Sequence, residues 1–208
     1  MHIPPGFQER DPAVAYRIMR EARLPTLVTA TAQGLAATPL PLFLDEKKGE
    51  KGTLYGHLAR ANPQWKQAPA GEALVIFTGA QAYVSPSWYP SKLEHGKAVP
   101  TWNYEVVHAH GPARFFEDEA SLLAVVERLS DLHEQARERP WTLADAPGDY
   151  IAKLLRGIVG VRIPITRIEC ARKMSQDRSA RDRHGVAEGL ARSELATDRK
   201  LAGRVALD

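Results

Sequence analysis

Residues 53–111 constrain the fold of this sequence more than any other region. They contain two apolar, strand-like segments, residues 73–77 and 102–109, and three of the four tryptophans of the chain. A protein that used its aromatic residues only to fill a core would spread them along the sequence, whereas ligand pockets gather aromatic side chains around a few polar groups. We therefore predict that this region binds a planar, phosphate-bearing cofactor and that the other elements support it.

A β-hairpin is predicted on the N-terminal side of this region. Residues 26–31 and 35–44 are strand-like and flank a glycine, Gly34, as in a tight turn. Pro39 and Pro41 interrupt the second segment. Because proline lacks the amide hydrogen that a strand donates to its neighbour, this segment is expected to be an edge strand, or a place where the backbone turns toward a ligand.

Further strands and helices follow. Residues 73–77 and 81–85 predict a second hairpin with its turn at Gly79. Residues 101–109 alternate between two faces as a strand does, and residues 119–137 carry the apolar stripe of an amphipathic helix. Several short strands combined with a few helices predict a mainly β fold with helical additions, an α+β protein built on a small β-barrel.

The composition is that of an ordinary globular protein with a mild basic excess. The 208 residues carry a formal net charge of +3, and the sequence pI is about 9.0. This excess permits contacts with phosphate or nucleic acid without requiring them. The single cysteine, Cys170, excludes an intramolecular disulfide and any zinc site built from cysteines. No apolar run approaches the ~20 residues of a membrane span, so we expect a cytoplasmic protein.

One polar cluster lies where a predicted strand ends and a helical turn begins. It consists of His57, Arg60, Asn62 and Trp65. Unpaired amides at a helix start, next to an arginine, are suited to an anion, and a guanidinium can hold a phosphate through two parallel hydrogen bonds. The alternative is structural: Asn62 caps the turn, Arg60 is a solvated charge and His57 is a core histidine.

A second cluster consists of Thr101, Trp102, Asn103 and Tyr104. An indole and a phenol on one face of a strand can cover an aromatic ring system, while Thr101 and Asn103 form hydrogen bonds with its polar edge. The alternative is a barrel strand whose aromatic side chains fill the interior.

Two other groups of residues carry weaker signals. His108 and His110 have a spacing that metal ions use, but no carboxylate or third histidine follows at a recognisable interval, so no metal site is predicted. Residues 172–183 carry five basic side chains and two aspartates. Such a stretch is usually a solvated face; the alternatives are contact with a cofactor phosphate or with the DNA backbone, although no helix-turn-helix signature is visible.

Several longer runs resemble one known family. These runs are GHLARANPQW from residue 56, ALVIFTGAQAYVSPSWY from residue 73, VPTWNYEVVHAHG from residue 99, IVGVRIPITRIE from residue 158, KMSQDR from residue 173 and GVAEGL from residue 185. With the opening MHIPPGF they cover nearly the whole chain up to residue 190. In these runs the sequence resembles the PaiB-type FMN-binding negative transcriptional regulators.

The resemblance implies a split β-barrel that binds FMN at the interface of a homodimer. It also implies that His57 and Arg60 hold the FMN phosphate, as basic residues do at this place in the wider pyridoxamine-phosphate-oxidase-like group. The family's C-terminal Ser-Gln-Asn-Arg motif reads SQDR here, which makes Gln176 and Arg178 further candidates for contact with the cofactor.

The predicted function is that of an FMN-binding, homodimeric repressor of transcription with DNA as its partner. One alternative is an FMN-dependent oxidoreductase of the pyridoxamine-phosphate-oxidase-like group, and another is a barrel that has lost the cofactor. Residues 1–170 are predicted to form the split β-barrel flavin-binding domain with helical additions, and residues 171–208 a basic, helical C-terminal extension whose end is either a further helix or disordered. The predicted cofactor contacts are His57, Arg60, Asn62, Trp65, Thr101, Trp102, Asn103, Gln176 and Arg178.

Overall fold

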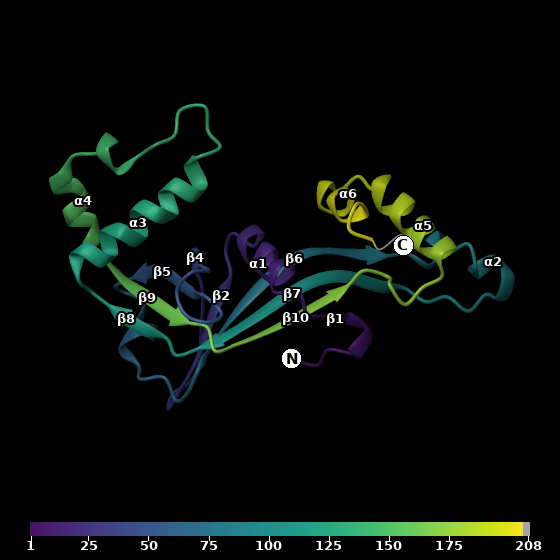
Figure 1. The fold of residues 1–208 in the computed structure, drawn as a ribbon, viewed down its shortest axis with the longest axis horizontal. Coiled ribbons are helices and arrows are strands. Elements are labelled where there is room, and N and C mark those ends of the chain that lie inside the picture. Colours follow the sequence, from purple (N-terminus) through teal and green to yellow (C-terminus); the bar gives the residue numbers. More distant parts are fainter. Residues whose placement is uncertain (206–208) are drawn as a thin grey trace. The chain divides into compact units, whose positions relative to one another are not determined.

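The computed structural model describes residues 1–205, and the chain divides into two compact units. Unit 1 comprises Met1–Ile18, Thr78–Val107 and Glu169–Asp208. Unit 2 comprises Met19–Phe77 and His108–Ile168. The chain passes from one unit to the other four times, within helix α1 and within strands β6, β7 and β10 (Figure 1).

Strands outnumber α-helices among residues 1–205, as the sequence predicts for this fold class. The strands are β1 (Gln8–Glu9), β2 (Thr26–Thr31), β3 (Gly34–Pro39), β4 (Leu42–Asp45), β5 (Thr53–Ala59), β6 (Ala73–Val84), β7 (Thr101–Gly111), β8 (Arg114–Phe116), β9 (Ile158–Pro164) and β10 (Arg167–Lys173). The α-helices are α1 (Pro12–Glu21), α2 (Lys92–His95), α3 (Glu119–Glu134), α4 (Gly148–Leu155), α5 (Ala180–Ala191) and α6 (Ala196–Ala202). Short 3-10 helices are η1 (Pro5–Phe7), η2 (Pro63–Lys66), η3 (Pro86–Trp88) and η4 (Leu143–Asp145). The mainly β fold with helical additions is confirmed.

Unit 2 contains an antiparallel sheet in the order β4-β5-β9-β8. Strand β5 pairs along its whole length with β9. Because side chains alternate along a strand, Leu54 and Leu58 are buried on one face of β5, while Tyr55 and His57 lie on the other. Helix α3 packs against β5 and β9 and buries its apolar stripe there. The sheet and this helix thereby form the framework that holds the end of β5.

The predicted N-terminal hairpin is present in unit 2. Strands β2 and β3 pair in register from Thr26↔Pro39 to Thr31↔Gly34, and Gly34 has the positive φ of 113° that a tight turn needs. Strand β3 lies at an edge of its sheet. The predicted edge position is therefore confirmed, but the predicted single segment, residues 35–44, is divided: β3 ends at Pro39, and β4 begins at Leu42 in another sheet.

The predicted second hairpin, with its turn at Gly79, is wrong. Strand β6 runs without a break from Ala73 to Val84. A β-carbon at Gly79 would lie 2.9 Å from the Cβ of Glu105 and 3.1 Å from a methyl group of Ile18. Glycine at this position therefore allows the backbone of β6 to lie close to neighbouring side chains within unit 1, and it does not form a turn.

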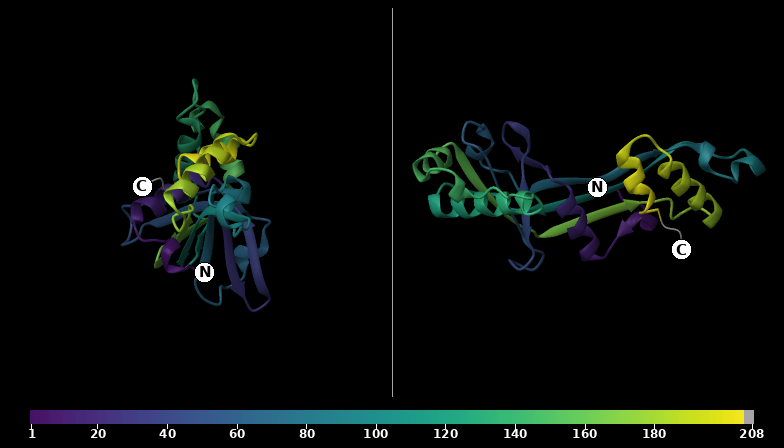
Figure 2. Two further views of the ribbon diagram at one scale, coloured as in Figure 1. Left: turned by 90° about the vertical axis from the view of Figure 1, so that its right-hand side faces the viewer. Right: turned by 90° about the horizontal axis from the view of Figure 1, so that it is seen from above.

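Unit 1 is built on neighbouring strands in the order β1-β10-β7-β6, which run side by side in Figures 1 and 2. Helices α5 and α6 contact each other and share a core with the end of β6. The side chains of this core are Ala82, Val84, Tyr89, Met174, Val186, Leu190, Leu201 and Val205. Apolar burial is thus what attaches the C-terminal helices to the sheet.

Two glycines of α5 form a notch for Trp88. A β-carbon at Gly185 would lie 2.1 Å from the carbonyl oxygen of Trp88, and one at Gly189 would lie 2.3 Å from its indole ring. The two glycines are four residues apart and therefore lie on the same face of the helix. This close packing explains the GVAEGL run that contributes to the family resemblance.

The predicted long helix is also present, although α3 ends at Glu134, before the predicted end at residue 137. Helices α5 and α6 lie within the predicted C-terminal extension, residues 171–208. The proposed division of domains after residue 170 stays a prediction. Within residues 1–205, no helix is long and apolar enough to cross a membrane.

Candidate functional site

The first candidate cluster follows strand β5 in unit 2. The guanidinium of Arg60 donates a hydrogen bond of 2.7 Å from Nε to the carbonyl of Arg156 and one of 3.2 Å to the carbonyl of Ile158. It also forms an ion pair with Glu117 and lies 5.8 Å from the ring centre of Trp65. Arg60 is therefore held in place by its own chain, and an incoming phosphate would compete with Glu117 for it.

The turn after Arg60 satisfies its own hydrogen-bonding groups. Asn62 caps η2, because its Oδ1 accepts a hydrogen bond of 2.9 Å from the amide of Gln64, and its Nδ2 donates one of 2.8 Å to Thr38. Gln64 is buried, and its side-chain amide donates to Thr29 at 3.0 Å. Trp65 Nε1 donates to the carbonyl of Arg60 at 2.9 Å. The Asn-Pro-Gln-Trp sequence thus ties the turn to strands β2 and β3.

His57 differs from its neighbours because one polar atom remains unsatisfied. Within residues 1–205, Nδ1 of His57 is buried and has no hydrogen-bond partner. The imidazole lines a cavity of about 270 Å³ together with Pro41, Leu129, His133 and Trp141. Burial lowers the pKa of His57, which favours the neutral ring. A buried group without a partner carries a desolvation cost that a ligand can remove.

The second candidate cluster lies on strand β7 in unit 1. Trp102 is 54% exposed, and its ring meets that of Tyr83 edge to face at 6.0 Å. Asn103 lies on the opposite, buried face, where its Nδ2 donates a hydrogen bond of 3.0 Å to Ser175 Oγ. Thr101 accepts a hydrogen bond from Nζ of Lys173. The aromatic pair therefore faces outward, while the Asn103 amide is engaged inside the unit.

The SQDR motif forms a turn that joins both ends of the chain in unit 1. Ser175 is buried and has a φ of 62°, in the left-handed region that favours glycine. The amide of Met174 donates to Gln176 Oε1 at 2.6 Å, and Gln176 Nε2 donates to the carbonyl of Gly6 at 3.1 Å. Arg178 lies 5.2 Å from the ring centre of Tyr89. Gln176 therefore links the MHIPPGF and SQDR runs.

A buried carboxylate lies beneath the outward face of β7. Glu105 is fully buried and pairs with Arg17 at 2.8 Å, with Arg172 at 3.3 Å and with Arg204 at 2.5 Å. Burial alone would raise the pKa of Glu105, but the hydrogen bonds and charges of Arg17 and Arg204 outweigh it and lower the pKa. These pairs connect α1, β10 and the chain after α6 to the strand that carries Trp102.

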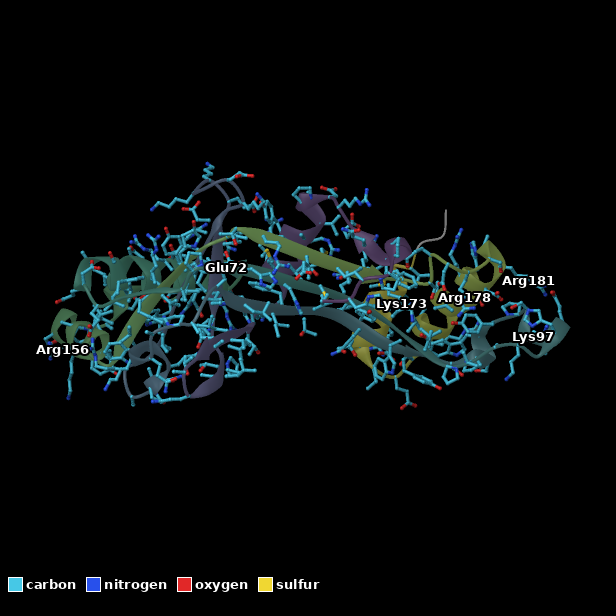
Figure 3. All side chains as sticks on the ribbon, turned by 90° about the horizontal axis from the view of Figure 1, so that it is seen from below. Glu72, Lys97, Arg156, Lys173, Arg178 and Arg181 are labelled. Carbon is cyan, nitrogen blue, oxygen red and sulfur yellow. The ribbon has the colours of Figure 1, made fainter. Side chains whose placement is uncertain are left out.

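The predicted contacts fall into two groups. His57, Arg60, Asn62 and Trp65 lie in unit 2 on β5 and the turn that follows it, and Thr101, Trp102, Asn103, Gln176 and Arg178 lie in unit 1. Sequence reasoning overlooked Thr38 as the partner of Asn62, and Lys173 as the partner of Thr101. Lys173 belongs to the basic stretch noted in the sequence, and Figure 3 shows it near Arg178. Nothing in the sequence near Thr38 marks its role.

Each unit offers part of the chemistry that a flavin nucleotide requires. In unit 1, the outward-facing indole of Trp102 offers the flat contact that a tricyclic ring needs. In unit 2, His57 Nδ1 has no partner among residues 1–205, and the guanidinium of Arg60 could hold a phosphate only in competition with Glu117. The Asn62 side chain is the least suited of the group, because the cap and Thr38 already engage it.

Comparison with known proteins identifies relatives along the whole chain. The family model described as "Putative FMN-binding domain" matches residues 1–167. "Protease synthase and sporulation protein PAI 2" of Bacillus subtilis is 33% identical over 203 residues, which cover 97% of this chain and 95% of that protein. An uncharacterized protein of Emericella nidulans is 30% identical over 234 residues, covering 95% and 92%.

Solved structures share the fold at lower identity. The flavocytochrome Anf3 from Azotobacter vinelandii has a TM-score of 0.60 at 15% identity, covering 83% of this chain and 72% of that chain. The FAD and heme binding protein from Mycobacterium smegmatis has a TM-score of 0.58 at 16% identity, covering 84% and 78%. At these identities the likeness concerns the fold alone.

Proposed function

Because this chain belongs to the FMN-binding family whose model it matches, and its cofactor is FMN, we propose that it acts as a homodimeric, FMN-binding repressor of transcription. The relative named "Protease synthase and sporulation protein PAI 2", which is 33% identical to this chain, supports a regulatory role. The mild net positive charge of +3 is compatible with DNA as the partner.

The outward-facing aromatic pair on β6 and β7 is the observation that carries the proposal. Trp102 is 54% exposed and Tyr83 is 46% exposed, and Val99, just before β7, is 67% exposed. Large apolar side chains gathered on one surface mark a site that a ligand or a second chain covers. A flavin ring and a partner subunit are the two occupants that the proposal assigns to this face.

The binding roles follow from the chemistry of each half-site. His57 and Arg60 would hold the phosphate or the polar edge, and Trp102 would contact the ring. A homodimer allows the polar half-site of one subunit and the aromatic half-site of its partner to act on one cofactor. When bound, FMN supplies the exchange of electrons or hydride, and the protein orients it and controls access of water.

The contact with DNA is assigned to basic side chains of unit 1. Lys97, Lys173, Arg178 and Arg181 lie in the same part of this unit in Figure 3. Arg181 pairs with Glu94, and Lys173 donates to Thr101, so neighbouring groups position these side chains. Cationic side chains of this kind contact the phosphate oxygens of DNA, and such contacts do not by themselves distinguish one base sequence from another.

The experiment uses freshly purified, full-length protein. We expect a flavin absorbance spectrum, a dimer mass, and binding to the DNA upstream of its own coding sequence that weakens steeply with salt. The Trp102→Ala variant should lose flavin and dimer mass while its circular dichroism stays unchanged. A dimeric, FMN-loaded protein whose DNA binding is absent or insensitive to salt would refute the regulatory role and leave the cofactor assignment intact.

An FMN-dependent oxidoreductase is the second candidate, and the same exposure of Trp102 favours it. A flavin covered on one side by an outward-facing indole can present its other side to a second reactant. Anaerobic addition of NADH or NADPH, followed by bleaching of the flavin band, would support this candidate. An unchanged spectrum with both nucleotides would remove its simplest mechanism.

A further inference from the structure

A second cavity in unit 2 is lined by four segments, and none of the predicted flavin contacts is among its lining residues. It has a volume of about 410 Å³, lies among the end of α1, strand β4, Phe77 of β6 and the C-terminal part of α3, and shares Leu129 with the cavity beside His57. Its apolar lining includes Met19, Leu42, Phe77, Leu129 and Leu132. Ligand pockets for small molecules typically have volumes of ~300–1,000 Å³, so the size suits a small organic ligand, and the walls combine these apolar side chains with polar ones.

The charged side chains around this cavity are mostly cationic. Arg20, Arg23 and Arg128 line it, and Glu46 is its single carboxylate. Glu46 forms an ion pair with Arg20. Within the described part of the chain, neither Arg23 nor Arg128 forms an ion pair or a side-chain hydrogen bond. Both arginines are exposed, so the cavity combines apolar side chains with two solvent-accessible guanidinium groups that lack an anionic partner among the described residues.

We propose that this cavity binds a small amphipathic carboxylate, with its apolar chain against Met19, Leu42 and Phe77 and its carboxylate beside Arg23 and Arg128. A guanidinium presents a planar fork of N–H donors that matches a carboxylate, and the resulting hydrogen bonds are strengthened by charge. The apolar tail contributes affinity in proportion to the surface that it removes from water. A cation of the same shape should bind more weakly, because the guanidinium groups repel it. A neutral alcohol should also bind more weakly, because it provides no counter-charge for them.

The site goes beyond the proposed flavin function. None of the nine predicted FMN contacts lines this cavity. Its occupant is a second ligand, and in a regulator such a ligand is an effector. The inference does not depend on DNA binding, because it rests on the lining and charge of unit 2 alone.

The test uses full-length, FMN-loaded protein and three ten-carbon probes: decanoate, decylammonium and decanol. Isothermal titration at moderate ionic strength should show decanoate binding with one site per chain, and about tenfold or more tighter than either of the other probes. The double variant Arg23→Ala, Arg128→Ala should bind decanoate about tenfold more weakly and should bind decanol with unchanged affinity. A matched control, Lys153→Ala, removes an exposed cation of the same unit that does not line the cavity, and should change nothing.

A second variant keeps the test independent of charge. Ala22→Trp places an indole in the cavity and should abolish decanoate binding while the melting temperature and the flavin content stay near those of the wild type. Equal affinity for decanoate and decanol would overturn the proposal, and so would undiminished binding after both arginines are removed. Release of FMN by decanoate would also overturn it, because the cavity would then belong to the flavin site. Loss of DNA binding, by contrast, would bear on the proposed function alone.

Discussion

Replacing Glu105 by glutamine tests whether one buried carboxylate holds unit 1 together. The side chain of Glu105 has no exposed surface, and it pairs with Arg17, Arg172 and Arg204. Glutamine preserves the size of the side chain and removes its charge. Three guanidinium groups would then face a neutral amide.

The expected loss of stability follows from the exposure of the four groups. Removing one partner of a buried ion pair costs about 3–5 kcal/mol, because the remaining charge stays without compensation. Here the side chains of Arg17, Arg172 and Arg204 are 33%, 32% and 26% exposed, so water solvates them in part. We therefore expect the lower end of that range, about 3 kcal/mol. For a chain of this length, that corresponds to a fall in Tm of about 6–12 °C.

The stability that Glu105 contributes depends on pH in a direction that its pKa determines. The pKa of Glu105 is lowered in the folded protein, so the unfolded state binds a proton more readily. The contribution of Glu105 is therefore present at neutral pH and is lost as the pH falls through its folded pKa. Wild type and Glu105→Gln should differ most at pH 7 and converge in acid. Thermal unfolding followed by circular dichroism at a series of pH values measures this difference.

Glu94 offers a matched control in the same unit. It pairs with Arg181, and its side chain is 59% exposed. An exposed ion pair contributes about 0–1 kcal/mol, so Glu94→Gln should shift Tm much less than Glu105→Gln does. Because Arg204 follows α6, limited proteolysis should also cut the Glu105→Gln protein faster near its C-terminus. Equal shifts for the two variants, or a difference that does not change with pH, would refute the argument.

Three further predictions concern packing, protonation and the phosphate anchor. Gly189→Ala should lower the free energy of unfolding by about 1–3 kcal/mol, because the added methyl group overpacks against the indole of Trp88. Gly203→Ala is the control and should leave stability unchanged, because a β-carbon there meets no atom within 4 Å. Unfolding followed by tryptophan fluorescence measures both variants. Burial lowers the pKa of His57 below its ordinary 6.5, so the unfolded state binds a proton more readily than the folded state does. Stability should therefore fall as the pH drops below that ordinary value. Urea unfolding midpoints measured between pH 5.5 and 8 should show this fall for the wild type and not for His57→Gln. If Arg60 anchors the phosphate, Arg60→Ala should weaken FMN binding by about 1.5–3 kcal/mol and Glu117→Gln should strengthen it, whereas unchanged affinity in both variants rejects the assignment.

The local elements were predictable where a short stretch of sequence decides the conformation. The β2–β3 hairpin depends on a glycine between two strand-like segments, and α3 depends on its apolar stripe and on the cap that Asp118 provides. Gly79 shows the limit of such reasoning. A glycine inside a strand pattern fits a turn as well as a close approach, and the neighbours that decide, Glu105 and Ile18, are distant in the sequence.

The candidate site was harder to predict, because residues that bind ligands are also the residues that complete turns. Asn62 and Gln64 have the chemistry of a polar binding site, and yet their amides are engaged by the cap and by strands β2 and β3. His57 has an equally ambiguous sequence context, and it is the residue whose buried nitrogen lacks a partner among residues 1–205.

Glu105 shows the converse. It is one position in an alternating strand, and its three arginines lie 88, 67 and 99 residues away, so the sequence gives no sign of the cluster. A motif in the sequence therefore identifies which chemistry is available. The hydrogen bonds that each group already makes determine which part of that chemistry remains for a ligand, and for this chain they direct attention to His57, Trp102 and the cationic cavity.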